Sequence, residues 1–393
     1  MKIDASALRR SSITKVGAAL LALIAALVVA QRLRAVSHRY DQFDFVVFYG
    51  WWTDYSGGGN PWTDQLGPML GCNYTPAFIE VFSPLARVSQ KTAFWLWQGA
   101  QVLCMAAAML LLALGGDSPL RIVPTIVVLS LVLMSRPFSA ALSWSQIAPM
   151  LLALLCGAWY CARRNRPAIA GLWLALAALL KVFPAGVAGY FLFARNWRAL
   201  AWTVAFFAAG VLATNPAHWL ELATNGLPIS YRITGHGGLT VLAFVRQCVA
   251  HFSGTRGAGE PFFAVWGFTA LFDFALLAIA IALTTTGRAR SDLDGLLFGL
   301  WVALALLLSP LAWSQDILLL LPASVFGILA AWDGYQVAEP SGIAALLAGA
   351  AMLSVCVVTS LIKAIPHPGF LIVLITYLGA ALIFRTRTRQ GLP

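Results

Sequence analysis

Acidic and aromatic residues are concentrated in one segment, Tyr40 to Pro61, directly after the first apolar stretch of the chain. This segment contains three aspartates, Asp41, Asp44 and Asp54. Acidic side chains beside a lipid bilayer are costly, so a group of them indicates a functional site. Since a carboxylate can take a proton from a hydroxyl group, general-base chemistry is what we expect from this segment.

The composition shows what must position these acids. Of the 393 residues, 60% are hydrophobic and only 10% are charged, whereas soluble domains carry about 25% charged residues. The apolar residues form long runs, and a run of about 20 is enough for a helix to cross a bilayer. We therefore expect an all-α polytopic membrane protein, with residues 1–393 forming a single membrane domain.

The net charge of +11 could suggest a nucleic-acid partner, but the distribution of the basic residues argues against it. They lie in short clusters at the ends of apolar segments, which is typical of cytoplasmic loops. The partner that this pattern indicates is the lipid bilayer. Arg32 and Arg34, which follow the first apolar segment, would be exceptions to the rule if that segment runs outward.

The region 167–194 is interrupted at its centre by Lys181 and Pro184, and basic clusters flank both of its ends. Two short helices that turn at this point keep both clusters on the same side of the membrane, so we expect a helical hairpin. Together with the other apolar segments, this gives about twelve transmembrane or partly spanning helices with both termini cytoplasmic. The expected segments are 16–30, 94–114, 119–135, 147–162, the two halves of 167–194, 198–213, 262–284, 293–311, 315–332, 342–363 and 368–384.

Two large loops then face the extracytoplasmic side: a first loop at 31–92, in which 76–88 could form a short surface helix, and a second at 214–261. On this topology acids, cations and polar groups gather at the outer face. The cations can hold a lipid-linked phosphate. Besides the acids of the first loop, the residues expected at the outer face are Lys181, Arg232, Arg246, Trp144, Ser145, Gln146, His236, Trp313, Gln315 and Asp316.

Each of these residues has a structural alternative. Asp44 could cap a helix or pair with Arg39, and Lys181 could extend to the membrane interface. Arg232 and Arg246 could be ordinary loop charges. His236 could be a polar loop residue, because a lone histidine marks no metal site. These alternatives remain open from the residue chemistry alone.

The tryptophans and cysteines carry weaker signals. Trp51–Trp52 and the stretch from Phe94 to Trp97 are expected to form interfacial aromatic belts, with sugar stacking as the minority alternative. Cys72 and Cys248 fall in loops on the same side and could form a disulfide. The cysteines show no metal-ligand spacing. No cofactor is expected, and the need for a divalent metal is left open.

Five short motifs follow one another along nearly the whole chain, and their order resembles that of glycosyltransferase family 87. This family comprises the polyprenol-phosphate-dependent mannosyltransferases of the GT-C superfamily. The motifs are Asp44-Phe45 with Phe48-Tyr49 and Gly59-Asn60-Pro61-Trp62; Tyr74-Thr75-Pro76 with Ser83-Pro84-Leu85-Ala86; Ser145-Gln146-Ile147; Lys181-Val182-Phe183-Pro184 with Arg195-Asn196-Trp197-Arg198; and Ser309-Pro310-Leu311-Ala312-Trp313.

The resemblance implies a GT-C-type fold and an inverting transfer of a sugar, typically mannose, from a polyprenyl-phosphate donor. The acceptor would be a glycolipid or glycan hydroxyl at the extracytoplasmic face of the inner (plasma) membrane, and we expect a monomer. Asp44 matches the family's catalytic base. Lys181, with Arg232 and Arg246, is expected to bind the donor phosphate. The expected substrate-binding residues are Tyr49, Gln146, His236, Trp313, Gln315 and Asp316.

The chain departs from the family pattern in two places. Where the family often has an acidic residue and a histidine, this chain has Ser314, Gln315 and Asp316, and Trp62 stands where tyrosine is usual. The missing histidine motivates one alternative, an inactive relative that serves as a scaffold. The second alternative is a transporter or lipid-linked sugar flippase. Transporters usually show internal repeats and midplane charges, whereas here the acids are concentrated in one outer loop.

Overall fold

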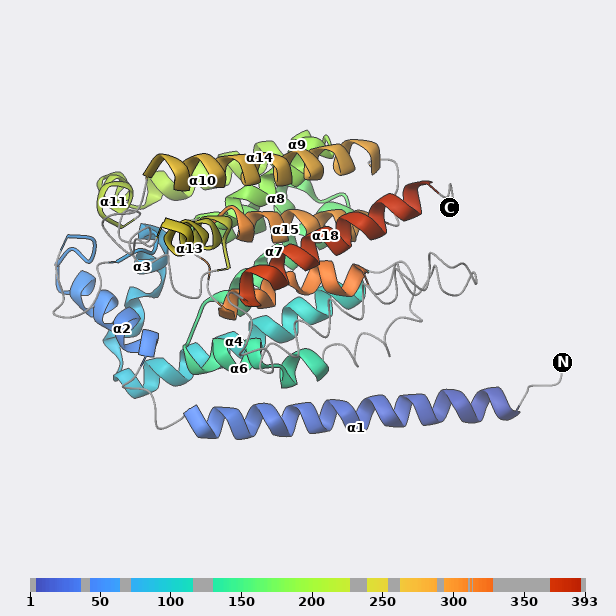
Figure 1. Cartoon of the computed structure of the whole chain (residues 1–393). Helices are drawn as coiled ribbons and strands as arrows, with labels where there is room; N and C mark the ends of the chain where they lie inside the picture. Colours follow the sequence, from blue (N-terminus) through green and yellow to red (C-terminus); the bar gives the residue numbers. More distant parts are fainter. Residues whose placement is uncertain are drawn as a thin grey trace.

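The chain folds into α-helices and short helical turns, and no strand occurs among the described residues (Figure 1). The computed structural model describes residues 5–36, 43–63, 72–115, 130–226, 239–253, 262–287, 293–309, 312, 314–327 and 368–389. Helix α1 (Ala5–Val36) begins and helix α18 (Pro368–Arg389) ends at the same end of the bundle, opposite α2 (Phe43–Ser56) and α3 (Pro76–Phe82) (Figure 1). This arrangement agrees with the prediction that both termini lie on one side.

The core of the bundle surrounds α15 (Asp294–Leu307), in which every residue from Gly295 to Leu307 is buried. A helix that is apolar on all sides is expected at such a central position. Its neighbours include α14 (Phe262–Gly287), α18 (Pro368–Arg389) and the short segment η6 (Ser314–Leu320). The helix at 321–327 follows η6 directly.

A second layer consists of four helices, each packed against the next. They are α4 (Gln90–Leu114), α7 (Ala148–Arg163), α8 (Pro167–Leu180) and α10 (Trp197–Ala213). Small residues allow the closest approach, since Gly171 on α8 abuts Trp202 and Gly210 on α10 abuts Leu179. These two contacts require α8 and α10 to run in the same direction.

The parallel course of α8 and α10 confirms the hairpin predicted at Lys181. The chain leaves α8 at Lys181 in an extended conformation and returns through the 3₁₀ turn η3 (Phe183–Val187) and α9 (Ala188–Phe193). Pro184 lies at the start of η3, where a residue without a backbone N–H cannot continue α8. The basic residues before α8 and after α9 therefore lie at the same end of the bundle.

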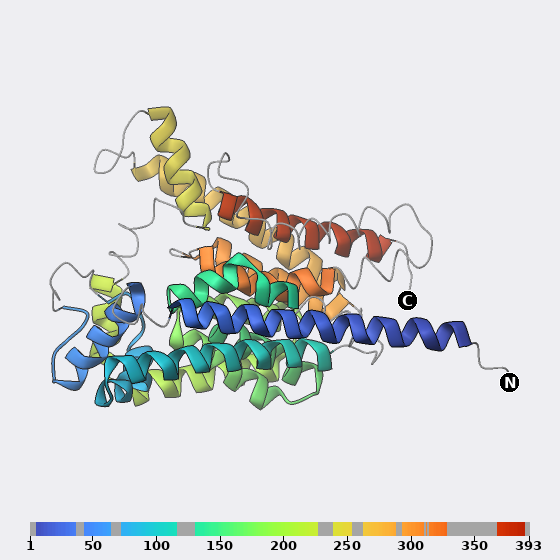
Figure 2. The same ribbon diagram turned by 90° about the horizontal axis from the view of Figure 1, so that it is seen from below.

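Helix α1 (Ala5–Val36) lies along one side of the bundle and is mostly exposed (Figures 1 and 2). Near its end, Arg32 donates hydrogen bonds to the carbonyl oxygens of Leu133, Met134 and Ser135, at 2.9, 2.6 and 2.9 Å. These carbonyls terminate the helical turn before α6 (Arg136–Ser143). A cation at such a position neutralises the unpaired carbonyls. This contact gives Arg32 a structural role and explains why it is an exception to the rule that basic residues mark the cytoplasmic ends of helices.

The end of the bundle opposite the two termini, here called the α2 end, is built from short helices. The sequence predicted mainly loop here, with one short helix at 76–88. The helix predicted at 76–88 is present as α3 (Pro76–Phe82) and the 3₁₀ turn η1 (Ser83–Arg87), whereas α2 (Phe43–Ser56) was not predicted. The second predicted loop likewise contains α11 (Pro216–Glu221), a π-turn at Leu222–Gly226 and α13 (Val241–Ser253).

The tryptophans predicted as interfacial belts are part of the core at the α2 end. Trp51, Trp52 and Trp97 are buried, and Trp52 packs against Phe45, Phe78 and Trp97. The belt assignment was therefore wrong for these residues, because contacts between α2, α3 and α4 cover the rings. A disulfide between Cys72 and Cys248 is also excluded, since both thiols are free.

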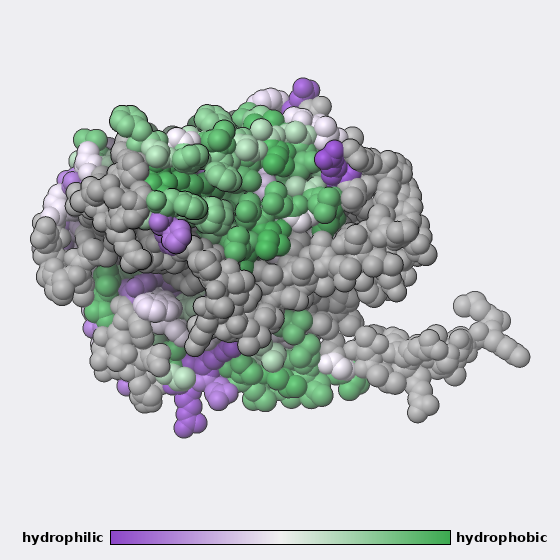
Figure 3. Space-filling model, viewed as in Figure 1, coloured by the Kyte–Doolittle hydropathy of each residue, from purple (hydrophilic) through white to green (hydrophobic). Residues whose placement is uncertain are grey.

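Within the described part of the chain, three helices are long and apolar enough to cross a membrane: Ala19–Val36, Gln90–Leu114 and Phe263–Thr286. A fourth candidate is Trp197–Ala213 with Pro216–Gly226, which bend by 105°. Shorter apolar helices make up the remainder of the described bundle. On the face seen in Figure 3, the side chains of the described outer helices are largely apolar. These features are those of a multi-pass membrane protein, whereas the expected number of about twelve helices includes segments outside the described residues.

Replacing Arg32 tests whether it anchors α1. We expect Arg32→Gln to lower the free energy of unfolding by about 1.5–3 kcal/mol, because hydrogen bonds from a charged group are lost. The measurement is thermal or denaturant unfolding in detergent. Arg32→Lys, which keeps the charge but not the forked donor, should have an intermediate effect. Equal stability of the Gln variant and the wild type would contradict the anchoring role.

Candidate active site

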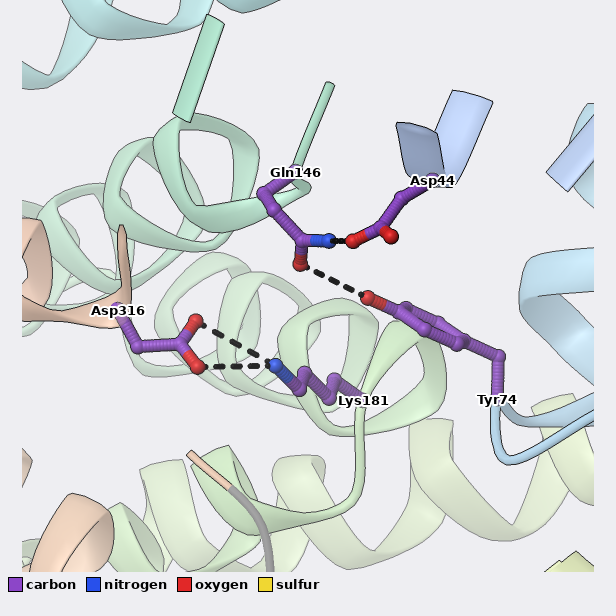
Figure 4. Close-up of polar contacts among 5 residues, drawn as sticks. All are labelled: Asp44, Tyr74, Gln146, Lys181 and Asp316. Carbon is purple, nitrogen blue, oxygen red and sulfur yellow. Dashed lines mark hydrogen bonds and ion pairs between the residues drawn. The ribbon is translucent and has the colours of Figure 1, made fainter. Parts of the chain in front are cut away.

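Asp44 lies in the first turn of α2, at the α2 end of the bundle. The helix is held in place by Phe45, Phe48 and Trp52, which are buried on one side of it. The carboxylate of Asp44 accepts a hydrogen bond from Nε2 of Gln146 (Figure 4). A negative charge in the first turn also interacts favourably with the helix dipole. The local fold therefore fixes an acid at a helix terminus while leaving it partly exposed.

Gln146 belongs to the tight turn that joins α6 to α7, and α4 holds this turn from behind. Ser145 has a positive φ of 55°, which is uncommon for a residue with a side chain. The turn is stabilised by Trp97 Nε1, which donates to the Ser145 carbonyl at 2.7 Å, and by Gln98 Nε2, which donates to Ser145 Oγ at 3.0 Å. Gln101 Nε2 donates to the backbone carbonyl of Gln146.

These α4 residues were not among the site residues predicted from the sequence. Gln98 and Gln101 are three residues apart in the mostly apolar part of α4 that follows its first turn, and both are fully buried. Polar side chains at this spacing share one face of a helix, and their burial requires hydrogen-bond partners. The spacing was the signal that could have indicated a polar site against α4.

Tyr74 connects the carboxylate to the lysine. Its hydroxyl donates to Oε1 of Gln146 at 3.3 Å, and its ring lies 5.9 Å from Lys181 Nζ. The next residue, Thr75, caps α3 by accepting from the Phe78 N–H at 3.2 Å and donates to the Leu180 carbonyl at 3.3 Å. One threonine hydroxyl thus joins the start of α3 to the end of α8.

Lys181 forms a buried ion pair with Asp316 of η6. Lys181 Nζ lies 3.3 and 3.2 Å from the two carboxylate oxygens. The side chain of Lys181 is 14% exposed, whereas that of Asp316 is 0% exposed. Figure 4 shows how Asp44, Tyr74, Gln146, Lys181 and Asp316 converge from separate elements. An ion pair this deep persists only when its geometry is good.

Burial raises the pKa of the Asp44 carboxyl to about 6, although the hydrogen bond from Gln146 and the charge of Lys181 act in the opposite direction. Burial also raises the pKa of the Tyr74 hydroxyl, and the carboxylates of Asp316 and Asp44 add to this rise. Tyr74 therefore stays protonated. A carboxyl group with a pKa near neutrality is suited to proton transfer.

The structure brings four of the predicted site residues together: Asp44, Gln146, Lys181 and Asp316. The hydroxyl of Tyr49 donates to the Val88 carbonyl at 2.8 Å, toward η1. Arg246 lies on α13 and is partly exposed, and Gln315 belongs to η6, with its side chain outside the described set. Arg232, His236 and Trp313 lie outside the described residues.

Among the described residues, no group of three or more histidine, cysteine, aspartate or glutamate side chains is arranged to hold a metal ion.

Comparison with known proteins identifies the family. The model of glycosyltransferase family 87 matches residues 73–310, which is more than half of the chain. The chain belongs to glycosyltransferase family 87. The matched range includes Tyr74, Gln146 and Lys181, whereas Asp44 and Asp316 lie outside it. Family membership favours a glycosyltransferase over the transporter and flippase alternative.

One curated relative of this family 87 protein is the "Polyprenol-phosphate-mannose-dependent alpha-(1-2)-phosphatidylinositol mannoside mannosyltransferase" of Mycobacterium tuberculosis (strain ATCC 25618 / H37Rv). It is 27% identical over 299 residues, which cover 72% of this chain and 67% of the relative. The two chains are therefore distant homologues.

The raised pKa of Asp44 has a consequence for stability. Because the folded pKa of about 6 exceeds the unfolded value, stability falls as pH rises from about 4 to about 6 and stays lower above it. Asp44→Asn removes this cost. We expect the variant to be more stable than the wild type at about pH 7.5 and equally stable at about pH 4. Melting temperatures in detergent at both pH values test this, and a variant less stable at the higher pH would contradict it.

Proposed function

We propose that this family 87 protein transfers a sugar from a polyprenyl-phosphate donor to a hydroxyl group of a glycolipid or glycan. Mannose is the sugar we propose, because the relative is named for a polyprenol-phosphate-mannose-dependent reaction on a phosphatidylinositol mannoside. The observation that carries the proposal is that a partly exposed carboxylate, Asp44, and a lysine at a helix break, Lys181, lie at the same end of the bundle and are linked through Gln146 and Tyr74.

Asp44 suits the role of general base better than Asp316 does. Asp316 is fully buried, and both of its oxygens contact Lys181, so its carboxylate is out of reach of a substrate. Asp44 is partly exposed and has a pKa of about 6. It is ionised at neutral pH and still basic enough to accept a proton from a hydroxyl group as that group reacts.

The proposed reaction is a single displacement with inversion. The acceptor oxygen forms a bond to the anomeric carbon of the sugar while its proton moves to Asp44. The bond between that carbon and the phosphate oxygen breaks, and its electron pair leaves with the polyprenyl phosphate. This leaving group needs no protonation, so one base and a cationic site are sufficient.

We propose that Lys181 holds the leaving phosphate. A lysine ammonium group has three N–H donors, and in this structure Asp316 receives the contacts of Lys181 Nζ at 3.3 and 3.2 Å. The remaining donor capacity is available to the phosphate. Since Asp316 already balances the charge of Lys181, we expect further cations to assist, and Arg232 and Arg246 are the candidates. Tyr49, His236, Trp313 and Gln315 remain candidates for sugar or acceptor contacts.

The proposed orientation puts the α2 end on the extracytoplasmic side of the plasma membrane. Arg163, Arg164 and Arg166 lie before or at the start of α8, and Arg195 and Arg198 follow α9. They lie at the end of the bundle opposite Lys181, because the hairpin returns there. Excess arginine marks the cytoplasmic side.

Asp44→Asn tests the role of the base. We expect sugar transfer from the polyprenyl-phosphate donor to fall by about 10²–10⁴-fold, because a positioned base contributes about that much. Transfer of radiolabelled mannose from polyprenyl-phosphate mannose to membrane lipids is the measurement. Asp54→Asn, on the same helix α2, is the matched control and should keep its activity. Full activity of Asp44→Asn would refute the assignment.

Replacing Lys181 tests donor binding. Lys181→Met should lower kcat/KM for the donor by roughly 10–100-fold, because a charge-assisted hydrogen bond is lost, with a smaller effect on the acceptor KM. That change alone leaves Asp316 buried without its partner. The double variant Lys181→Met with Asp316→Leu removes both charges and should show the same loss of donor use. Equal effects on donor and acceptor would argue against a phosphate role.

A further inference from the structure

The side-chain amide of Gln146 lies between the Asp44 carboxylate and the Tyr74 hydroxyl. An ionised carboxylate only accepts hydrogen bonds, whereas a hydroxyl can donate and accept. Nε2 of Gln146 donates to the Asp44 carboxylate, and its Oε1 accepts from the Tyr74 hydroxyl at 3.3 Å (Figure 4). Gln146 is 4% exposed and Tyr74 is 8% exposed. Neither side chain can replace its partner with bulk water, so the two contacts depend on each other.

The protonation state of Asp44 decides how this amide must face. An ionised carboxylate only accepts hydrogen bonds, so the NH₂ group of Gln146 must point to it and Oε1 must point to Tyr74. A protonated carboxyl group can donate. The amide can then turn over, so that Oε1 accepts from Asp44 and Nε2 donates to the oxygen of Tyr74. The terminal torsion of glutamine is broad and roughly two-fold, so this turn requires little rearrangement.

A tyrosine hydroxyl is the partner that permits both orientations, because it donates in one and accepts in the other. The surroundings stay fixed during such a turn. The backbone of Gln146 is held by Gln101, and the neighbouring Ser145 is held by Trp97 and Gln98. The Tyr74 backbone carbonyl accepts from Trp62 Nε1 at 3.0 Å. The parts that can move are therefore the amide group and the hydroxyl hydrogen.

We propose that Tyr74 and Gln146 form a reversible hydrogen-bond pair that positions Asp44 both before and after it takes the acceptor's proton. Both are positioning residues, since they act through Asp44. The inference rests on the proposed role of Asp44 as the base. It changes the role of Gln146, which was expected to bind substrate, and it gives Tyr74 a function beyond packing.

The same pair connects the base to the cation. The Tyr74 ring lies under Lys181 Nζ, 5.9 Å away, and Thr75 next to it is bonded to the last carbonyls of α8. A shift of Tyr74 would thus move the lysine relative to the carboxylate. The charged and titratable groups that act on this part of the site are Asp44, Tyr74, Lys181 and Asp316.

Tyr74→Phe is the direct test, because it removes the hydroxyl and keeps the ring. We expect kcat to fall roughly tenfold, the effect of one lost hydrogen bond, with little change in the KM of donor or acceptor. The pH of half-maximal rate should rise, since a less well-oriented amide stabilises the ionised Asp44 less. Tyr55→Phe is the matched control: its hydroxyl bonds Glu80 on the same side of the molecule, and its kcat and pH profile should stay unchanged.

A double-variant comparison separates positioning from packing. Gln146→Leu should lower kcat by roughly 10–100-fold, because a hydrogen bond to a charged group is lost. Adding Tyr74→Phe to Gln146→Leu should cause no further loss, since the hydroxyl acts through the amide. Additive losses, an unchanged pH profile in Tyr74→Phe, or a change confined to KM would overturn the inference. If Tyr74→Phe is fully active while Asp44→Asn is inactive, the inference fails and the proposed function stands.

Discussion

The buried ion pair between Lys181 and Asp316 is the constraint on which the α2 end of the bundle depends. It joins the broken end of α8 to η6, two segments 135 residues apart. Removing either partner would leave a charge uncompensated in a nearly dry site, which is more costly than the pair itself is stabilising. The position of Lys181 in turn depends on Thr75, which ties the end of α8 to the start of α3. The ion pair and the hydrogen bonds of Thr75 therefore help to position the neighbouring residues of the site.

The ion pair also gives the two acids, Asp44 and Asp316, different roles. Asp316 is fully buried and contacts Lys181 with both carboxylate oxygens, whereas Asp44 is partly exposed and burial raises its pKa to about 6. The two carboxylates differ in burial and in partners, not in chemical type. Two acids of the same type can take different roles when their environments differ. In the proposed function, one acid prepares the phosphate site and the other meets the acceptor.

Much of this arrangement could be predicted from the sequence. The apolar runs gave most of the described helices, the helix break at Lys181 followed from charge and proline, and Asp44 was singled out with the motif around it. Helix α2 was missed, because its aromatic side chains favour a helix only through their packing against α3 and α4. Trp52 and Trp97 were wrongly assigned to interfacial belts for a similar reason. A tryptophan suits a membrane interface and a protein core equally well, and only the tertiary packing decides between them. The partner of Lys181 could not be found, because no local pattern links residues 181 and 316.

The contribution of α4 shows the same limit in another form. Gln98 and Gln101 lie in a helix that reads as a membrane span, and their function depends on a turn more than forty residues further along the chain. Their burial is intelligible only once the Ser145–Gln146 turn is seen beside them. A sequence pattern can show which face of a helix is polar. It cannot show which group contacts that face, because the tertiary fold determines this.

The most direct test of the central claim is a structure of the full-length protein with a bound polyprenyl-phosphate sugar donor. The account predicts that the phosphate contacts Lys181 Nζ and that the anomeric carbon of the sugar faces an open space beside the Asp44 carboxylate. A donor phosphate bound at the opposite end of the bundle, near Arg163 and Arg195, would contradict it. So would a sugar held against Asp316 with Asp44 turned away.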